Sequence, residues 1–141
     1  MQRTANAQWK GGLRDGKGTI STASGVLDNT QYSFSTRFES GKGTNPEELV
    51  AAAHAGCFTM ALSAELGKAS ITPESIETKC TVTFEKTDSG FTVTESHLDV
   101  TAKIPNANKA AFDKATADAK AGCPISRLLN TKITLSATLQ G

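Results

Sequence analysis

The segment from Leu49 to Ala64 constrains the fold most, because it contains no formally charged residue. It follows Asn45-Pro46-Glu47-Glu48, which supplies a capping side chain, a proline suited to the first helical position and acids for the first turn. Only three of its side chains are clearly polar, so a helix here is apolar almost all round. We therefore expect a long, buried central helix that ends near Glu65 and Gly67. It is alanine-rich and short for a membrane span, so we expect no membrane partner.

Strand patterns flank this helix on both sides. Residues 18–22 and 32–38 alternate in side-chain character between Gly-rich turns, which predicts a β-meander within residues 1–40. Residues 76–86 and 91–103 also alternate, and Asp88-Ser89-Gly90 between them favours a β-hairpin. Further elements are expected at 109–120 (helix), 124–129 (short helix) and 132–139 (strand). This order predicts an α+β fold with antiparallel sheets around the central helix, in one domain covering residues 1–141.

Size and charge narrow the class of function. A chain of 141 residues can bury roughly two thirds of its unfolded surface without a cofactor or a metal to hold it together. Its formal net charge of +1, with Lys interleaved among Glu and Asp, argues against a nucleic-acid partner. The first ten residues contain no apolar stretch of signal-peptide length, so we expect a cytoplasmic protein. In that reducing compartment a disulfide is more often transient and catalytic than structural.

The cysteines differ in their surroundings. Cys57 lies about three turns into the apolar helix, too far from its N-terminus for the helix dipole to acidify it, and burial should raise its pKa. A buried cysteine among alanines is usually an inert small hydrophobe, so Cys57 needs a nearby cation to be reactive. His54, one turn earlier, could serve, although a lone histidine on such a helix is more often a hydrogen-bonded structural residue.

Cys123 precedes Pro124, which places it at the N-cap of the short helix, where backbone N–H groups favour a thiolate. Cys80 lies within an alternating strand pattern and is most simply a core residue. Three cysteines and two histidines at these spacings do not form a zinc pattern, so we expect no metal site.

Five runs together resemble one known family, the osmotically inducible protein C and organic hydroperoxide resistance family, and its osmotically inducible branch most. They are Gly-Val-Leu-Asp, Phe-Ser-Thr-Arg-Phe-Glu, Lys-Gly-Thr-Asn-Pro-Glu-Glu-Leu, Ala-Ala-His-Ala-Gly-Cys-Phe-Thr-Met-Ala-Leu and Lys-Ala-Gly-Cys-Pro-Ile-Ser. The match extends from Trp9 to the last expected strand, and the Thr-Asn-Pro-Glu-Glu and Gly-Cys-Pro segments are specific in combination.

The resemblance implies a cofactor-free, thiol-dependent peroxidase that reduces organic hydroperoxides and hydrogen peroxide and works as an intertwined homodimer. It implies that Cys57 is the peroxidatic cysteine, that Cys123 is the resolving cysteine, and that Arg37 and Glu47 complete the site. A dihydrolipoyl group is the typical dithiol reductant in the hydroperoxide-resistance branch. Arg14 falls where that branch carries its own catalytic arginine, so either Arg14 or Arg37 could be the cation.

Physical reasoning supports an arginine and a second subunit in such a site. A permanently ionised guanidinium can hold a thiolate and a peroxide oxygen, while a carboxylate orients it. Without the resemblance, Arg37 would read as a strand-end charge and Glu47 as a helix-start acid. Glu47 and Cys57 are also about 15 Å apart along one helix axis, so a shared site needs the glutamate of another subunit.

Two other functions fit the residues alone. One is a binding or redox-sensing protein for an apolar small molecule, without turnover. The other is a structural or chaperone-like dimer with inert thiols. Turnover separates the first from a peroxidase, and thiol reactivity at neutral pH separates the second.

Overall fold

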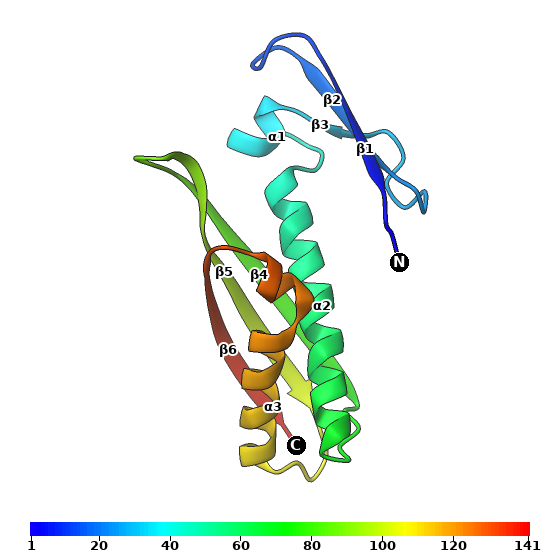
Figure 1. Cartoon of the computed structure of the whole chain (residues 1–141), viewed down its shortest axis with the longest axis vertical. Coiled ribbons are helices and arrows are strands. Elements are labelled where there is room, and N and C mark those ends of the chain that lie inside the picture. The colour runs from blue at the N-terminus through cyan, green and yellow to red at the C-terminus, as the bar shows by residue number, and fades with distance from the viewer. The chain divides into compact units, whose positions relative to one another are not determined.

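The computed structural model describes residues 1–141, which form two compact units, Met1–Leu49 and Val50–Gly141. The long helix α2 (Pro46–Lys68) begins in the first unit and continues through the second. The single domain expected over residues 1–141 stays a prediction. An α+β fold with two separate sheets and four helices is confirmed (Figure 1).

The first unit contains the expected β-meander. Strands β1 (Ala5–Lys10), β2 (Lys17–Thr22) and β3 (Thr30–Tyr32) pair antiparallel in that order. Gly18 is opposite both Trp9 and Tyr32, whose rings have centroids 5.5 Å apart. A Cβ at Gly18 would lie 2.5 Å from the Tyr32 ring and 2.6 Å from the Trp9 ring. Glycine is therefore needed at this position for the two aromatic side chains to lie together.

The strand expected over residues 32–38 is wrong beyond Tyr32. Residues Phe34–Phe38 form a short helix, α1, whose N-cap is Ser33. The Ser33 hydroxyl accepts from the Thr36 N–H (3.2 Å), and the Thr36 hydroxyl accepts from the Ser33 N–H (2.8 Å). This reciprocal capping satisfies two backbone donors locally, and it outweighs the alternating pattern that predicts a strand.

Helix α2 begins where the sequence predicts. The Asn45 side-chain oxygen accepts from the Glu48 N–H at 2.8 Å, and its amide nitrogen donates to the Thr36 carbonyl at 2.9 Å. Asn45 therefore caps α2 and fastens its start to α1. The helix has 23 residues and, by length and composition alone, is long and apolar enough to cross a membrane. The expectation that it is too short for a span is therefore wrong. The core helix of a soluble protein meets the same criterion.

Only one face of α2 is buried within the chain. The buried side chains are those of His54, Phe58, Leu62 and Leu66. The opposite face is exposed and consists mainly of small and apolar residues, namely Ala52, Ala53, Gly56, Met60 and Ala64, with Met60 77% exposed. The expectation of a wholly buried helix is therefore met on one face only.

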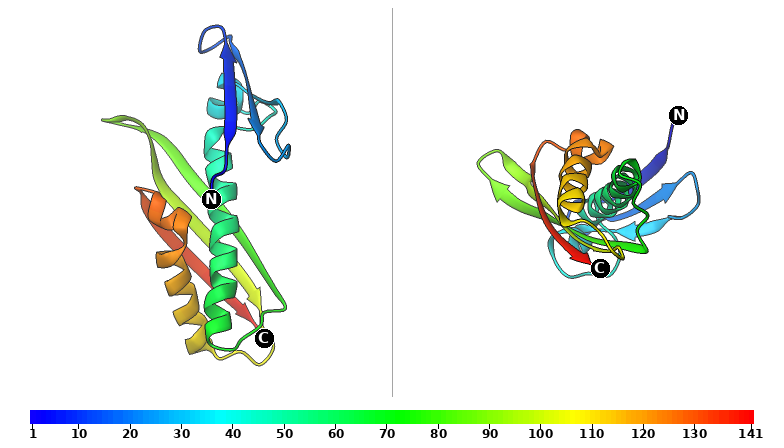
Figure 2. Two further views of the ribbon diagram at one scale, coloured as in Figure 1. Left: turned by 45° about the vertical axis from the view of Figure 1, so that its right-hand side comes forward. Right: turned by 90° about the horizontal axis from the view of Figure 1, so that it is seen from below.

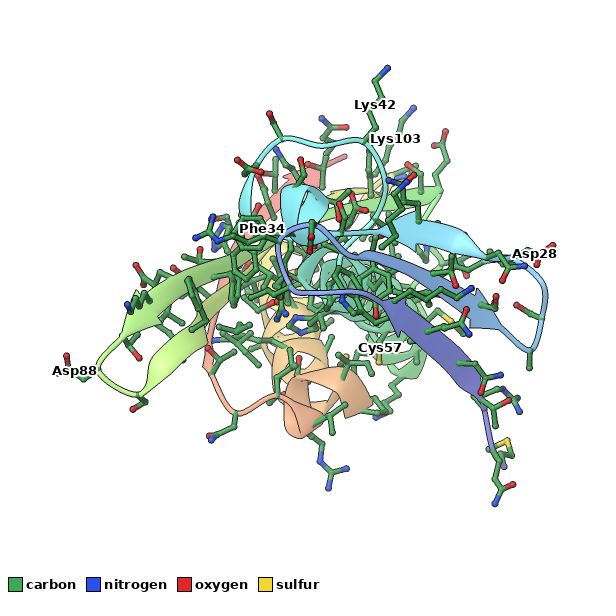
Figure 3. All side chains as sticks on the ribbon, turned by 90° about the horizontal axis from the view of Figure 1, so that it is seen from above. Asp28, Phe34, Lys42, Cys57, Asp88 and Lys103 are labelled. Atoms are coloured by element: carbon green, nitrogen blue, oxygen red, sulfur yellow. The ribbon has the colours of Figure 1, made fainter.

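The second unit contains a three-stranded sheet in the order β4, β5, β6. Strands β4 (Ser75–Thr87) and β5 (Gly90–Lys103) form the expected hairpin, with Asp88 at its tip (Figure 3). Strand β6 (Lys132–Gln140) pairs parallel to β5, so the expectation of purely antiparallel sheets is wrong here. Helices α3 (Lys109–Gly122) and α4 (Pro124–Leu128) connect β5 to β6, and such a helical crossover returns the chain in the same direction.

Helices α2 and α3 cover one face of this sheet (Figure 2). The core between them combines Phe58, Leu62 and Leu66 of α2 with apolar residues of β5 and α3, namely Leu98, Val100, Ala102, Phe112, Ala115 and Ala119. Cys123 is also part of this core and is fully buried. Cys123 is therefore surrounded by the apolar core of the second unit.

Removal of the Phe112 ring tests the importance of this core. Phe112 is 0% exposed, so Phe112→Ala should lower the free energy of unfolding by about 3–5 kcal/mol. Phe91→Ala is the matched control, because Phe91 is 57% exposed and lies 5.3 Å from the Phe84 ring centroid. It should cost about 1.5 kcal/mol or less. Chemical denaturation of both variants measures the difference, and equal losses would contradict the described core.

Candidate active site

Cys57 and Cys123 form the thiol pair of the second unit. Cys57 is partly buried on α2 (Figure 3), and Cys123 is fully buried at the N-cap of α4. Helix α3 ends at Gly122, and Pro124 opens α4 at a position where its missing N–H costs nothing. The Gly-Cys-Pro run therefore makes a sharp junction between two helices, and the cysteine sits at the corner. All three cysteines are free thiols.

The pKa of the Cys57 thiol is raised, as the sequence predicts. Burial is the largest cause, and the hydrogen bond with the neighbouring Cys123 side chain raises the pKa further. The backbone N–H of Ile125, in the first turn of α4, acts in the opposite direction because it favours the thiolate. Two groups of the same helical turn therefore act directly on the Cys57 sulfur.

Arg37 and Glu47 form an ion pair within the first unit. The Arg37 Nη2 lies 2.8 Å from the Glu47 Oε1, and the Arg37 Nε lies 3.1 Å and 3.3 Å from the two carboxylate oxygens. The pairing is possible because Arg37 lies in the last turn of α1 and Glu47 in the first turn of α2, and Asn45 holds these two helix ends together. A fork geometry of this kind fixes the plane of the guanidinium.

Arg14 has a different setting. Its guanidinium carbon lies 4.9 Å from the centroid of the Phe34 ring, and it makes no ion pair. Arg37 also approaches a ring, with its guanidinium carbon 5.5 Å from the Phe38 centroid. Of the two candidate arginines, only Arg37 is oriented by a carboxylate.

An apolar pocket of about 190 Å³ lies beside Arg37. Its lining is aromatic over most of its extent and consists of Trp9, Leu13, Tyr32, Ser33, Phe34, Arg37 and Phe38. Trp9 and Tyr32 reach it from the meander, whereas Phe34 and Phe38 come from α1. The sequence analysis missed this pocket. Several aromatic residues lie close to Arg37 in the sequence, and this was a usable signal for the pocket. The sequence could not show that their rings come together, because that depends on the turn at Ser33.

His54 is fully buried and is hydrogen-bonded by both ring nitrogens. Burial lowers its pKa, so the ring is neutral at pH 7. Cys80 is partly buried, and its sulfur lies 3.2 Å from the Ser96 Oγ and 3.9 Å from the His54 Nδ1. Burial raises the pKa of Cys80, and the hydrogen bond from Ser96 lowers it. These surroundings fit the reading of both residues as parts of the core.

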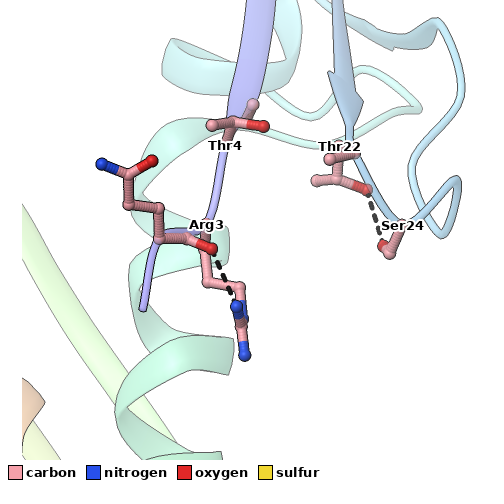
Figure 4. Close-up of a pocket in the computed structure, with 7 residues that line it drawn as sticks. Arg3, Thr4, Thr22 and Ser24 are labelled. Carbon is pink, nitrogen blue, oxygen red and sulfur yellow. Dashed lines mark hydrogen bonds between the residues drawn. The ribbon is translucent and has the colours of Figure 1, made fainter.

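A larger hollow elsewhere contains no cysteine, histidine or carboxylate side chain. It has a volume of about 680 Å³ and is lined by residues 2–5 and 22–24. Figure 4 marks two of the hydrogen bonds there, from Arg3 to the Gln2 carbonyl (2.8 Å) and between Thr22 and Ser24 (3.1 Å). No group of three or more His, Cys, Asp or Glu side chains is placed to hold a metal ion.

The predicted site residues are thus found as two pairs. Cys57 lies with Cys123 in the second unit, and Arg37 lies with Glu47 in the first. Each pair joins residues from different elements.

Comparison with known proteins identifies the family. Residues 39–138 match the family described as OsmC-like protein. The chain belongs to the OsmC-like family. This OsmC-like chain is 48% identical over 140 residues to Peroxiredoxin OsmC of Escherichia coli, covering 99% of the chain and 98% of that protein. It is 31% identical over 106 residues to Organic hydroperoxide resistance protein-like 2 of Staphylococcus epidermidis, covering 72% of each.

The solved structures agree with this assignment. The organic hydroperoxide resistance protein OhrB of Bacillus subtilis superposes with a TM-score of 0.69 at 25% identity, over 97% of this chain and 98% of that one. The resemblance found in the sequence is therefore confirmed, and the OsmC-like fold is confirmed with it.

The pKa of Cys57 provides a direct test of the thiol pair. Because the neighbouring Cys123 raises this pKa, Cys123→Ala should lower it. The labelling of Cys57 by iodoacetamide, followed by peptide mass spectrometry, should become faster at pH 8 than in the wild type and should reach its half-maximal rate at a lower pH. Cys80→Ala is the control and should leave this profile unchanged. An unchanged or upward-shifted profile in Cys123→Ala would show that the two thiols do not interact.

Proposed function

We propose that this OsmC-like chain is a peroxidase that reduces organic hydroperoxides, and hydrogen peroxide more weakly, by means of two cysteines. That it is a peroxide-reducing enzyme rests on its family and on its 48% identity to Peroxiredoxin OsmC over nearly its full length. The adjacency of Cys57 and Cys123 carries the two-cysteine part of the proposal. We also propose a role in oxidative or osmotic stress defence in the cytoplasm.

The reaction has three steps. The Cys57 thiol releases its proton, and the thiolate attacks the terminal peroxide oxygen, so that the O–O bond breaks and Cys57 becomes a sulfenic acid. The departing alkoxide takes up that proton and leaves as the alcohol. The Cys123 thiol then attacks that sulfur, so that an S–S bond forms and the hydroxyl departs with the thiol proton as water. A dithiol reductant, such as a dihydrolipoyl group, returns both cysteines to thiols and leaves as its own disulfide. No cofactor and no metal take part.

Arg37 and Glu47 are proposed to complete this site. A thiol whose pKa is raised by burial needs a cation to become a thiolate at neutral pH, and Arg37 is permanently charged. Glu47 would hold the guanidinium through the bonds it makes in the structure. We propose Arg37 rather than Arg14 because Arg37 alone has such a carboxylate partner.

The aromatic pocket beside Arg37 supports a preference for alkyl hydroperoxides. A hydrocarbon substituent placed against Trp9, Phe34 and Phe38 would leave water, and burial of apolar surface contributes roughly 25 cal/mol per Å². Hydrogen peroxide has no such substituent. The pocket would therefore increase the affinity for organic hydroperoxides without changing the chemistry at sulfur.

A homodimer is proposed as the working form. Glu47 and Cys57 belong to one continuous helix, where ten residues correspond to about 15 Å, so the carboxylate of one chain cannot serve its own cysteine through that helix. The exposed small and apolar face of α2, centred on Gly56 and Met60, is also expensive to leave in water. Packing of two α2 helices antiparallel about a twofold axis would cover this face. It would also bring each N-terminus towards the other chain's cysteine.

Turnover by cysteine variants tests the proposed mechanism. With cumene hydroperoxide and dithiothreitol, Cys57→Ser should have no turnover, whereas Cys80→Ser should retain a rate near that of the wild type. One equivalent of peroxide should produce a Cys57–Cys123 disulfide in the wild type, detected by peptide mapping. Full activity in Cys57→Ser, or a Cys57–Cys80 disulfide, would contradict the assignment.

Complementation between subunits tests the proposed dimer. Cys57→Ser and Glu47→Ala should each be nearly inactive. When the two variants are refolded together, mixed dimers should regain activity, because one of their two sites combines an intact cysteine with an intact glutamate from the other chain. The assay measures cumene hydroperoxide consumption alongside a tag-based count of mixed dimers. Mixed dimers without activity would show that Glu47 does not act across the interface.

A further inference from the structure

His54 links three elements of the second unit through a single buried imidazole. Its Nδ1 lies 2.7 Å from the Ser96 Oγ of β5, and its Nε2 lies 2.7 Å from the Ser126 Oγ of α4. His54 and Ser96 are 0% exposed and Ser126 is 6% exposed. Such a network is costly to bury unless every member is satisfied, and here no buried side-chain polar atom lacks a partner.

The position of this network relative to the two cysteines is informative. His54 is one helical turn before Cys57 on α2, and Ser126 is in the first turn of α4, whose N-cap is Cys123. Ile125, whose N–H acts on the Cys57 sulfur, immediately precedes Ser126. The His54–Ser126 hydrogen bond therefore joins the turn that carries one cysteine to the turn that carries the other.

Helix α4 is held at its first turn by the packing of Cys123 and Ile125 against the core and by the hydrogen bond of Ser126. It contains five residues, too few for helix propagation alone to stabilise it. Ser126 occupies the position from which a side chain can fold back to cap the helix, yet α4 has no side-chain cap bond, and the hydroxyl binds the imidazole instead. The Ser126 hydroxyl therefore adds a directional contact with α2 to this packing, and it constrains the turn that carries Cys123.

We propose that His54 is a positioning residue that acts through Ser126 to hold Cys123 ready to capture the Cys57 sulfenic acid. This inference rests on the proposed two-cysteine mechanism. When Cys123 attacks the Cys57 sulfenic acid, the Cys57 S–O bond breaks, the S–S bond forms, and the hydroxyl leaves as water with the Cys123 proton. The new bond needs an S–S separation of about 2.05 Å and a dihedral near 90°, so a small rotation of α4 would misalign it. If disulfide formation is slow, the sulfenic acid reacts with a second peroxide molecule and becomes a sulfinic acid.

The neutral ring is suited to this role. A neutral imidazole donates from one nitrogen and accepts at the other, so one serine hydroxyl donates to the ring while the other accepts from it. The Cys80 sulfur completes the network on the Ser96 side, remote in sequence from α4. His54 transfers no proton in the reaction and is not a catalytic residue.

Two serine-to-alanine variants separate positioning from general stability. Ser126→Ala and Ser96→Ala each delete one hydroxyl bonded to the same ring at the same distance, but only Ser126 belongs to α4. In single-turnover experiments with cumene hydroperoxide, Ser126→Ala should consume the peroxide at a rate within about twofold of the wild type. Its disulfide formation should be slower by about tenfold or more. The fraction of Cys57 found as sulfinic acid, by mass spectrometry, should rise at correspondingly lower peroxide concentrations.

Controls assign each outcome. Ser96→Ala should lower the melting temperature but form the disulfide within about twofold of the wild-type rate. Ser126→Thr keeps the hydroxyl and should give the wild-type ratio of disulfide to sulfinic acid. The positioning role would be overturned if Ser126→Ala formed disulfide and sulfinic acid in the wild-type ratio, or if both alanine variants had equal defects. Cys123→Ser tests the mechanism itself and should accumulate sulfinic acid at Cys57. If Cys123→Ser partitions like the wild type, the two-cysteine mechanism fails. If Cys123→Ser is altered and Ser126→Ala is not, only the role of His54 fails.

Discussion

The uncharged stretch of α2 is the constraint on which the rest of the structure depends. Without a charge from Leu49 to Ala64, this helix cannot remain in water on all sides. The mixed sheet and α3 cover the face that carries Phe58, Leu62 and Leu66. Covering this face places Cys57 against the junction of α3 and α4, so the same burial that stabilises the fold also creates the setting of the thiol pair.

Elements defined by local chemistry could be predicted from the sequence. The Asn45-Pro46 start of α2, the hairpin turn at Asp88 and the helix after Asn108 all depend on neighbouring residues, and all are found. The strand expected after Tyr32 failed because the reciprocal capping of Ser33 and Thr36 satisfies the backbone better than an extended strand would. The parallel pairing of β6 could not be read from its alternation, since side-chain periodicity is the same in both kinds of sheet.

The sequence identified the candidate site residues but not the contacts that hold them in place. Cys57 and Cys123 were singled out by residue type, Arg37 and Glu47 only by family resemblance, and the structure places one pair in each unit. The contacts of His54 could not be anticipated, because its serine partners, Ser96 and Ser126, are distant in sequence and are ordinary residues in their own segments. Sequence patterns identify groups with reactive chemistry more readily than the groups that hold them in place.

The raised pKa of Cys57 has a consequence for the life of the chain before assembly. In one subunit, burial and the Cys123 thiol keep the sulfur protonated, and a protonated thiol is a poor nucleophile. If Arg37 reaches the sulfur beside the Glu47 of a second subunit, a newly synthesised chain is unreactive towards oxidants. Reactivity would then appear only when two copies meet. The protein would thus avoid irreversible oxidation of Cys57 before the dimer, and with it the complete site, has formed.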